Sequence, residues 1–365
     1  MYKRKKGGSI IDSGAYGCVI KPNIECNEYL SSDKYITKLI DRQNEKGEFG
    51  IIDVLGLKNF RDFNKYIIIP LKSCSLNNGY NQIDIDNIKN KYRNDIDNCI
   101  QRLDDLKTMD NAVNIISEYG GKSFHFYREN NPYDSFINMI PYYCHLFECI
   151  IFLNNNGISH RDIKPGNILI DKDNKKIRLI DFGISAFIDD NKNISNKEYI
   201  TINFREDEKI GSYVIWPVEM YSFSNLYRDS NNRLLYITEE YLRNSMYTYL
   251  DMWLPLNEKY RYYDIVVDEC NKINDDIESN KYNIYEWKKI ANERLDVFSL
   301  GSVLMTEYKY LYNNANKYDI NIMDDIKEFI FTNMLCIDCR KRGSIIECYN
   351  KFKEICNKYK INMVL

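Results

Sequence analysis

The 365-residue sequence lacks a charge excess of either sign, a long apolar run and a signal peptide. Its 50 Lys and Arg residues against 53 Asp and Glu residues give a net charge of −3, so no overall positive field favours a nucleic acid as partner. The missing apolar run and the missing signal peptide argue against a membrane partner and against secretion. We therefore expect an intracellular protein. At this length the chain can form two domains or lobes.

The eleven cysteines show no repeated spacing, and their number is odd. This pattern favours free thiols in a reducing compartment over a disulfide framework. The closest pair, Cys336 and Cys339, has no second pair and no nearby His to complete a zinc site, so we expect a structural role for it. A short basic run, Lys3-Arg4-Lys5-Lys6, matches a nuclear address or a nucleic-acid contact. We favour a solvated tail and find no other nucleic-acid signal.

One stretch, from Ile158 to Gly183, concentrates the chemistry of the chain and reads ISHRDIKPGNILIDKDNKKIRLIDFG. Two apolar runs, 168–170 and 177–180, flank a polar turn at 171–176, which predicts a β-hairpin. Asn167 precedes the first strand and Asp181 follows the second, so the hairpin brings both side chains to one end. Their oxygens suit Mg²⁺, which completes its shell with phosphate oxygens. Asp162, in the same stretch, is the candidate for a base.

This stretch resembles the eukaryotic-type Ser/Thr protein kinase family, whose catalytic loop reads H-R-D-x-K-x-x-N and whose metal-binding motif is D-F-G. The resemblance implies an α+β, bilobal fold with a small β-rich N-lobe, residues 1–119, and a larger, mostly helical C-lobe, residues 120–365. Richness in Ile, Asn, Lys and Tyr resembles proteins of giant DNA viruses or of other AT-rich genomes. The first of these resemblances implies a viral kinase in the host cytoplasm or the virion.

Near the N-terminus the resemblance places a glycine-rich loop between two strands. Gly14, Gly17 and Val19 match the family pattern G-x-G-x-x-G-x-V, whereas Asp12 replaces the first glycine. Without Cβ atoms, the two glycines let backbone amides approach phosphate oxygens. Glu118 and Tyr119 resemble the hinge that meets adenine. The expected nucleotide-binding residues are Ile11, Asp12, Ser13, Gly14, Ala15, Tyr16, Gly17, Val19, Lys38, Glu118 and Tyr119.

The resemblance also assigns an ion pair in the N-lobe. Lys38 lies in an alternating segment, 35–40, at the position of the lysine that holds the α- and β-phosphates. Glu48, in a segment with helical spacing, resembles the glutamate that orients this lysine, and Glu45 is the alternative. A run at 66–70 reads as β-structure, and the next matching strand comes only at 113–116. An insertion near 77–110 separates them.

In the C-lobe an apolar stripe over 134–156 predicts a core helix that ends at Gly157. Pro141 either kinks this helix or marks its start. Residues 295–301 resemble the start of the family's helix F, whose Asp296 is implied to bind the catalytic-loop backbone. Arg342 is implied to pair with Glu219 at the end of the activation segment. A second insertion near 220–293 contains helical stretches around 239–250 and 282–292.

Together these residues imply a protein kinase that uses ATP and Mg²⁺ to phosphorylate Ser or Thr in protein substrates. Asp162 is the implied base, Lys164 contacts the γ-phosphate, and Asn167 and Asp181 hold the metal. Lys38 and Glu48 complete the catalytic set. Glu208 falls at the position of the phosphorylated activation-segment residue that Arg161 usually grips, which predicts activity without phosphorylation. The alternatives are a kinase-shaped nucleotide-binding scaffold, or pseudokinase, and a small-molecule kinase of the aminoglycoside type.

Overall fold

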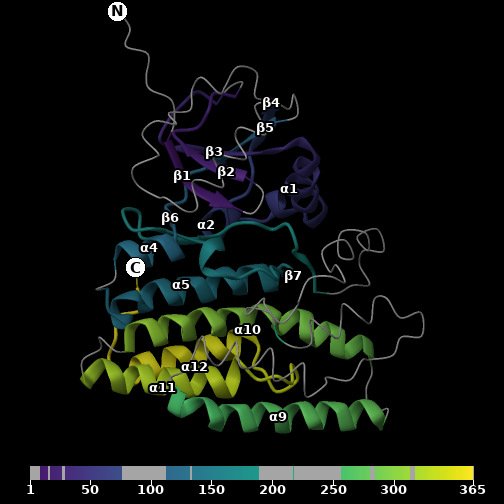
Figure 1. Ribbon diagram of the computed structural model, residues 1–365, viewed down its shortest axis with the longest axis vertical. Coiled ribbons are helices and arrows are strands. Elements are labelled where there is room, and N and C mark those ends of the chain that lie inside the picture. Colours follow the sequence, from purple (N-terminus) through teal and green to yellow (C-terminus); the bar gives the residue numbers. More distant parts are fainter. Residues whose placement is uncertain are drawn as a thin grey trace, which may run out of the picture. The chain divides into compact units, whose positions relative to one another are not determined.

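The computed structural model divides into two compact units, Met1–Gly121 and Lys122–Leu365. The first is built on a β-sheet and the second is mainly helical (Figure 1), so the expected α+β class, with a β-rich N-terminal part and a helical C-terminal part, is confirmed. The structure describes residues 9–14, 17–26, 29–75, 112–131, 134–188, 217, 256–279, 284–312 and 317–364.

The first unit contains a five-stranded antiparallel sheet in the order β1-β2-β3-β5-β4. The alternating segment at 35–40 forms β3, where Thr37 and Leu39 are fully buried. Lys38 lies between them in sequence, opposite Val19 on one neighbouring strand and Ile115 on the other. The strands are β1 Ser9–Gly14, β2 Gly17–Lys21, β3 Tyr35–Asp41, β4 Lys72–Ser75 and β5 Ala112–Glu118.

Helix α1, Arg42–Leu55, follows β3 directly and contacts β3 and β5. Ile51, Ile52 and Leu55 are buried, and Phe49 packs against Ile40, Val113 and Ile115 of the sheet. The chain continues through a 3₁₀ turn, η1 Leu57–Asn59, and a short helix, α2 Phe63–Tyr66. The prediction of β-structure at 66–70 holds only for Ile67, which forms a single β-bridge. The strand on this edge, β4, begins after Pro70, which has no N–H to donate to a ladder. Ile67, Ile68 and Ile69 are all buried without alternation.

The loop between β2 and β3 is tied to the sheet by polar groups and by a disulfide. The amide of Ile24 donates to Thr37 Oγ1 (2.8 Å), and Asn114 Nδ2 donates to the carbonyl of Ile24 (3.4 Å). Cys26 is joined to Cys74 of β4 by a disulfide, with their Cα atoms 5.9 Å apart. The expectation that the cysteines are all free thiols is therefore wrong for this pair, which tertiary structure alone brings together over 48 residues.

The second unit consists of stacked helices with short strands at one side (Figure 1). Its strands form two small sheets, β6-β8-β9 and β7-β10. The helices are α4 Phe124–Asn130, α5 Phe136–Asn155, α9 Leu256–Glu278, α10 Ile284–Tyr312, α11 Lys317–Asn333 and α12 Ile345–Lys358. The strands are β6 Lys122–Ser123, β7 Ile158–Ser159, β8 Ile168–Asp171, β9 Lys176–Leu179 and β10 Ala186–Phe187.

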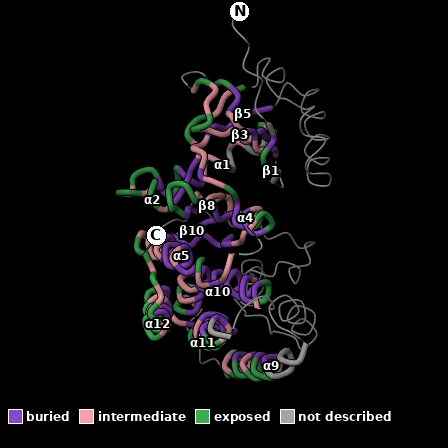
Figure 2. Tube along the Cα trace, turned by 90° about the vertical axis from the view of Figure 1, so that its left-hand side faces the viewer, coloured by how far each residue is buried: buried purple, intermediate pink, exposed green. Residues whose placement is uncertain are grey.

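Helix α5 is the core of this unit, as its apolar stripe predicted. Its length and composition would suit a membrane span, but it packs against β9, α10, α11 and α12, and Figure 2 shows it largely buried. It begins at Phe136, where Ser135 accepts a hydrogen bond from the Asn138 amide, so Pro141 lies inside the helix. Gly157 follows its C-terminus with φ +73°, a conformation that favours glycine.

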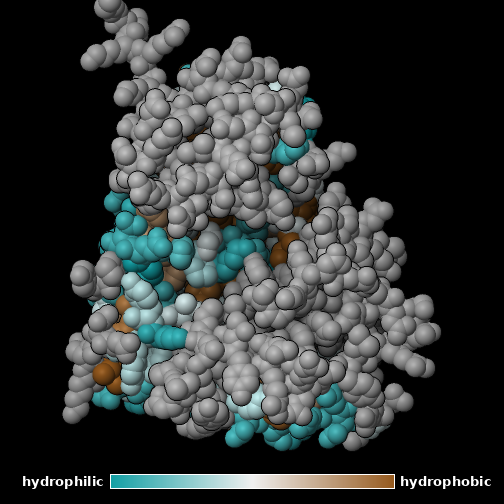
Figure 3. All heavy atoms as spheres, in the orientation of Figure 1, coloured by the Kyte–Doolittle hydropathy of each residue, from teal (hydrophilic) through white to brown (hydrophobic). Residues whose placement is uncertain are grey.

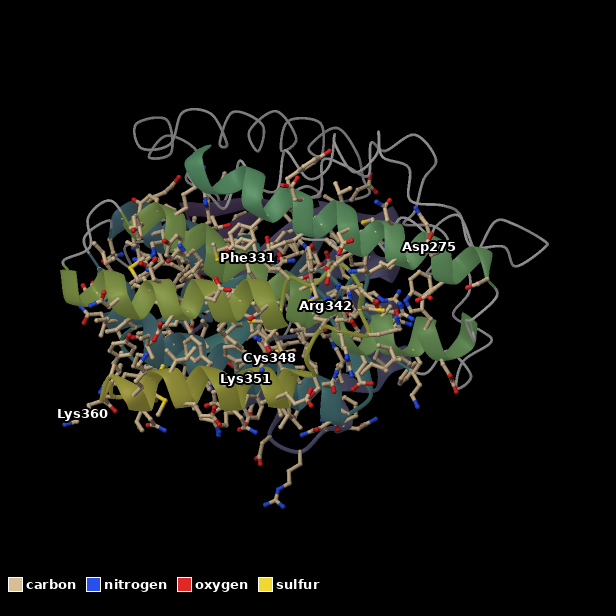
Figure 4. All side chains as sticks on the ribbon, turned by 90° about the horizontal axis from the view of Figure 1, so that it is seen from below. Asp275, Phe331, Arg342, Cys348, Lys351 and Lys360 are labelled. Atoms are coloured by element: carbon tan, nitrogen blue, oxygen red, sulfur yellow. A yellow bond between two sulfur atoms is a disulfide. The ribbon has the colours of Figure 1, made fainter. Side chains whose placement is uncertain are left out.

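Helix α10 begins at Ile284 and not at 295. The helical stretch expected at 282–292 and the expected helix F are one continuous helix. Preceding it, α9 packs on the outer side of α11, where Tyr262 stacks on Phe331 with ring centroids 3.7 Å apart (Figure 4). Glu269 of α9 accepts a hydrogen bond from the Ile337 amide (2.9 Å). The remainder of the second insertion, 220–255, and the first insertion at 77–110 lie outside the described residues.

A buried polar cluster joins three helices of the second unit. Arg128 of α4 forms an ion pair with Glu307 of α10, and both side chains are 6% exposed. The hydroxyl of Tyr143 on α5 donates to Glu307 (3.2 Å) and accepts from Arg128 Nη2 (3.3 Å). Burial raises the pKa of Glu307 against the opposing charge of Arg128. Outward residues of α4 such as His125 and Glu129 are exposed. Figure 3 shows a hydrophilic patch on the left of the molecule, at the level where Figure 1 labels α4.

Removing one charged member of this cluster should lower the free energy of unfolding more than removing both charges. We expect Glu307→Leu to lower the free energy of unfolding by about 3–5 kcal/mol, because it leaves Arg128 buried without its carboxylate. The double variant Arg128→Met/Glu307→Leu should lose clearly less. Urea unfolding of the three proteins measures both values. Equal losses in the single and double variants would contradict this account of the cluster.

Candidate functional site

The hairpin predicted at 168–180 is present and brings Asn167 and Asp181 to one end. Strands β8 and β9 pair antiparallel, with Ile168 opposite Leu179. The amide of Ile180 then donates to the carbonyl of Asn167 (3.0 Å). Asp181 comes directly after Ile180 and has φ +65°, the left-handed region that non-glycine residues seldom adopt. The backbone thus turns sharply where the expected metal ligand lies.

Asp162 lies within the same cluster and is held by two donors. Its Oδ2 accepts a hydrogen bond from Asn167 Nδ2 at 2.7 Å and lies 2.9 Å from Lys164 Nζ. Asn167 Nδ2 also donates to the Asp162 carbonyl (3.0 Å). The short 3₁₀ turn η3, Pro165–Asn167, closes the loop between these residues. The structure therefore brings together Asp162, Lys164 and Asn167, all named from the sequence.

His160 is fully buried and links the loop to the chain that follows β9. Its Nδ1 accepts a hydrogen bond from the Asp162 amide (3.2 Å), and its Nε2 lies 3.0 Å from the Ile180 carbonyl. An amide can only donate and a carbonyl can only accept, so a neutral imidazole with its proton on Nε2 satisfies both contacts. The ring also packs on Phe182, with centroids 4.7 Å apart. His160 therefore ties the backbone of Asp162 to the segment carrying Asp181.

Asp296 of α10 holds the backbone of this loop, as the resemblance implied. Its carboxylate accepts hydrogen bonds from the amides of His160 (2.6 Å) and Arg161 (2.8 Å) and from Ser159 Oγ (3.2 Å). The side chain is 2% exposed. Burial raises the pKa of Asp296, while the hydrogen bonds from the His160 and Arg161 amides and from Ser159 act in the opposite direction. Three donors on one carboxylate fix 159–161 to the helix.

Sequence reasoning missed the contacts made by two serines here. Ser159 donates to Asp296, and Ser185 Oγ donates to the His160 carbonyl (3.0 Å). Strand β10 pairs with β7 directly beside Ser185, with Ala186 opposite Ser159. A lone serine after D-F-G carries no pattern that would have identified this contact.

In the first unit the structure pairs Lys38 with Glu48. Lys38 Nζ, on β3, forms an ion pair with Glu48 Oε1 on α1, and both side chains are about four-fifths buried. Glu45, the alternative partner, instead accepts a hydrogen bond from Ser73 Oγ of β4. The two glutamates are one turn apart on α1, so Glu45 contacts β4 whereas Glu48 contacts β3.

The remaining nucleotide-binding candidates also lie in the first unit. Ile11, Asp12, Ser13 and Gly14 lie on β1, and Gly17 and Val19 on β2, with Gly14 opposite Gly17 at the turn. Ala15 and Tyr16 lie outside the described residues. Glu118 ends β5 and Tyr119 follows it. Lys21 Nζ lies over the Tyr119 ring, 3.3 Å from its centroid, a cation–π contact that the sequence did not suggest.

The expected partners of two arginines, Glu208 for Arg161 and Glu219 for Arg342, lie outside the described residues. Arg342 is fully buried, and its guanidinium donates to the carbonyls of Cys336 (2.8 Å) and Arg294 (3.1 Å). These contacts of Arg342 connect the loop between α11 and α12 to α10, whether or not Glu219 also binds this arginine.

The donor set of the cluster suits a hard cation. Asn167 directs its NH₂ group to Asp162, so its amide oxygen faces away from that carboxylate, and the Asp181 carboxylate lies at the same end of the hairpin. Oxygen ligands of this kind, few in number, are typical of Mg²⁺ bound together with a nucleotide. Among the described residues no group of three or more His, Cys, Asp or Glu side chains forms a metal site by itself.

Comparison with known proteins identifies the family of the chain. The chain matches the protein kinase domain over residues 87–352, well over half of its length. The chain therefore belongs to the protein kinase domain family. The match does not reach the glycine-rich segment, Lys38 or Glu48.

Three curated relatives are themselves named as kinases. The chain is 57% identical over 44 residues to the liver/testis phosphorylase b kinase gamma catalytic chain of Bos taurus. It is 44% identical over 70 residues to a probable serine/threonine-protein kinase of Dictyostelium discoideum, and 23% identical over 185 residues to the ovarian-specific serine/threonine-protein kinase Lok of Drosophila melanogaster. These alignments cover 12%, 19% and 47% of the chain and 11%, 14% and 38% of the relatives.

The hydrogen bonds on Asp296 lead to a prediction about stability. We expect Asp296→Ala to lower the free energy of unfolding by about 1–3 kcal/mol for each of the two amides it leaves unpaired. The control is Asp264→Ala on α9, where the carboxylate is exposed and the change should stay within about 0.5 kcal/mol. Urea unfolding compares them. An Asp296 variant as stable as the control would show that the loop does not depend on this carboxylate.

Proposed function

We propose that this protein is an ATP-dependent protein kinase that transfers the γ-phosphoryl group to Ser and Thr hydroxyls of proteins. The observation that carries the proposal is the Asp162 carboxylate, held by Asn167 and Lys164 on a loop that α10 fixes through Asp296. Phosphoryl transfer depends on positioning and on neutralising phosphate charge, and this loop supplies a placed base beside a placed cation.

In this proposal the roles follow the chemistry of each side chain. Asp162 accepts the proton of the substrate hydroxyl as the oxygen attacks phosphorus, and ADP leaves. Lys164 stabilises charge on the transferred group. Asn167 and Asp181 would hold Mg²⁺, which neutralises the phosphate oxygens when bound. In the first unit Lys38, oriented by Glu48, would contact the α- and β-phosphates, and Glu118 and Tyr119 would meet adenine.

The choice of Ser and Thr as acceptors rests on the catalytic loop itself. Lys164, two residues after Asp162, resembles the loop of Ser/Thr kinases, whereas tyrosine-specific relatives place an Ala-Ala-Arg or Arg-Ala-Ala sequence there. The names of relatives from Dictyostelium and Drosophila point the same way.

The first test removes the base. We expect Asp162→Ala to lower the turnover number by at least about a hundredfold, the low end for a positioned general base. Asp173→Asn, an exposed acid in the turn of the same hairpin, should keep wild-type turnover. A radiolabelled-ATP assay on a panel of Ser/Thr peptides measures transfer. Equal rates for Asp162→Ala and Asp173→Asn would overturn the proposed role of Asp162.

A pseudokinase that binds nucleotide without transferring phosphate is the second candidate. The features that favour it are Asp12, which puts a carboxylate where the family has its first glycine, and Pro217-Val218 in place of the Ala-Pro before Glu219. A carboxylate there would repel phosphate oxygens. Nucleotide binding without transfer to any substrate would support this candidate.

Magnesium dependence of ATP binding tests the proposed metal site, which both candidate functions share. We expect ATP with Mg²⁺ to raise the melting temperature by several degrees, since a ligand at about 100 times its Kd stabilises by about 2.7 kcal/mol. Chelation of the metal should remove most of this gain. Asp181→Asn should lose the metal-dependent part, whereas Asp173→Asn should keep it. A gain that is the same with and without Mg²⁺ would contradict a metal site at Asp181.

A further inference from the structure

Arg161, the residue before the proposed base, is held at two points by one helix. Its amide donates to Asp296 Oδ1 (2.8 Å), and its guanidinium Nη2 donates to Asn292 Oδ1 (2.9 Å). Arg161 is 4% exposed and Asn292 is 5% exposed. A charged side chain this deeply buried requires a polar acceptor, and Asn292 supplies one from α10.

The two acceptors are spaced to act together. Asn292 and Asp296 are four residues apart on α10, so their side chains lie one above the other on the same face of the helix. One acceptor binds the backbone of Arg161 and the other binds the end of its side chain. The helix therefore fixes both the position and the direction of this residue.

The conformation of Arg161 makes this anchoring important for its neighbour. Arg161 has φ +66°, a left-handed conformation that a non-glycine residue keeps only when its surroundings hold it there. Rotation at this residue would move Asp162, which follows it directly. The contacts of Asp162 with Lys164 and Asn167 therefore depend on the backbone that Arg161 sets.

We propose that Asn292 is a positioning residue for catalysis, acting through the guanidinium of Arg161 on the placement of Asp162. This inference rests on the proposed kinase function. Within the described part of the chain, the side chain of Asn292 bonds to Arg161 and to neither of the proposed metal ligands, so its removal affects turnover and leaves ATP binding unchanged. Both partners belong to the second unit, and the acceptor is a neutral amide of the chain itself. This hydrogen bond from Arg161 to Asn292, called the anchor below, therefore forms without phosphorylation of the chain.

The chain offers a matched control for the anchor. Asn154 of α5 donates through Nδ2 to the carbonyl of Glu293 (3.0 Å), the residue next to Asn292. Asn154→Ala therefore removes an asparagine hydrogen bond to the same turn of α10 without touching the loop at 159–162. It separates a general loosening of α10 from the loss of the anchor.

The experiment compares wild type, Asn292→Ala, Asn292→Asp and Asn154→Ala. Steady-state kinetics with ATP and a peptide substrate should show kcat lowered roughly ten- to a hundredfold in Asn292→Ala, the size of effect expected for a misplaced group. Its KM for ATP should stay within about twofold of wild type, since ATP binding does not involve this contact. Asn292→Asp keeps an acceptor oxygen and should restore kcat to within about threefold. Asn154→Ala should match wild type.

Amide hydrogen exchange of the segment 158–164 provides a readout that does not need activity. Exchange should be faster in Asn292→Ala and unchanged in Asn154→Ala. Unchanged exchange and kcat in Asn292→Ala, an equal loss of kcat in Asn154→Ala, or no rescue by Asn292→Asp would each overturn the inference. An inactive wild type would instead refute the proposed function, and the exchange data would then decide whether Asn292 anchors the loop.

Discussion

The second unit depends most on the carboxylate of Asp296, which lies inside the fold and accepts three hydrogen bonds from 159–161. A buried carboxylate is costly unless donors surround it, and a loop with a left-handed residue at Arg161 is costly unless something holds it. The loop amides stabilise the buried carboxylate, and the carboxylate in turn holds the loop in its left-handed conformation. The loop thus gains a fixed geometry from which Asp162, Lys164 and Asn167 project.

The same turn of α10 also makes contacts with the loop between α11 and α12. The carbonyl of Arg294 accepts from Arg342, and Arg294 Nη1 donates in return to the carbonyls of Arg340 (3.0 Å) and Cys339 (3.3 Å). Figure 4 shows Arg342 among the helices of the second unit. Residues 292–296 therefore connect the loop before the hairpin with the loop between α11 and α12. Both sets of contacts come from one continuous helix, which begins at Ile284.

The elements predicted correctly from the sequence are those whose structure depends on neighbouring residues. The hairpin at β8 and β9 and the core helix α5 followed from apolar periodicity and turn residues, and Lys38 was placed on a strand by its alternation. The run at 66–70 was mistaken for a strand because three successive isoleucines suit a strand and a buried coil equally well, and only tertiary packing decides between them. The Cys26–Cys74 disulfide depends on two segments meeting in space, which spacing alone did not reveal. Asn292 was missed for the same reason, because an asparagine inside a helix shows its partner only when the loop is in place.

We propose that Asn167 and Asp181 present their oxygens to a magnesium ion bound with ATP, next to the Asp162 carboxylate. The decisive measurement is a crystal structure of the protein with Mg²⁺ and a non-hydrolysable ATP analogue. We expect electron density for a metal coordinated by Asn167 Oδ1, by the Asp181 carboxylate and by phosphate oxygens. A nucleotide bound without a metal at these two residues, or bound elsewhere on the chain, would contradict it.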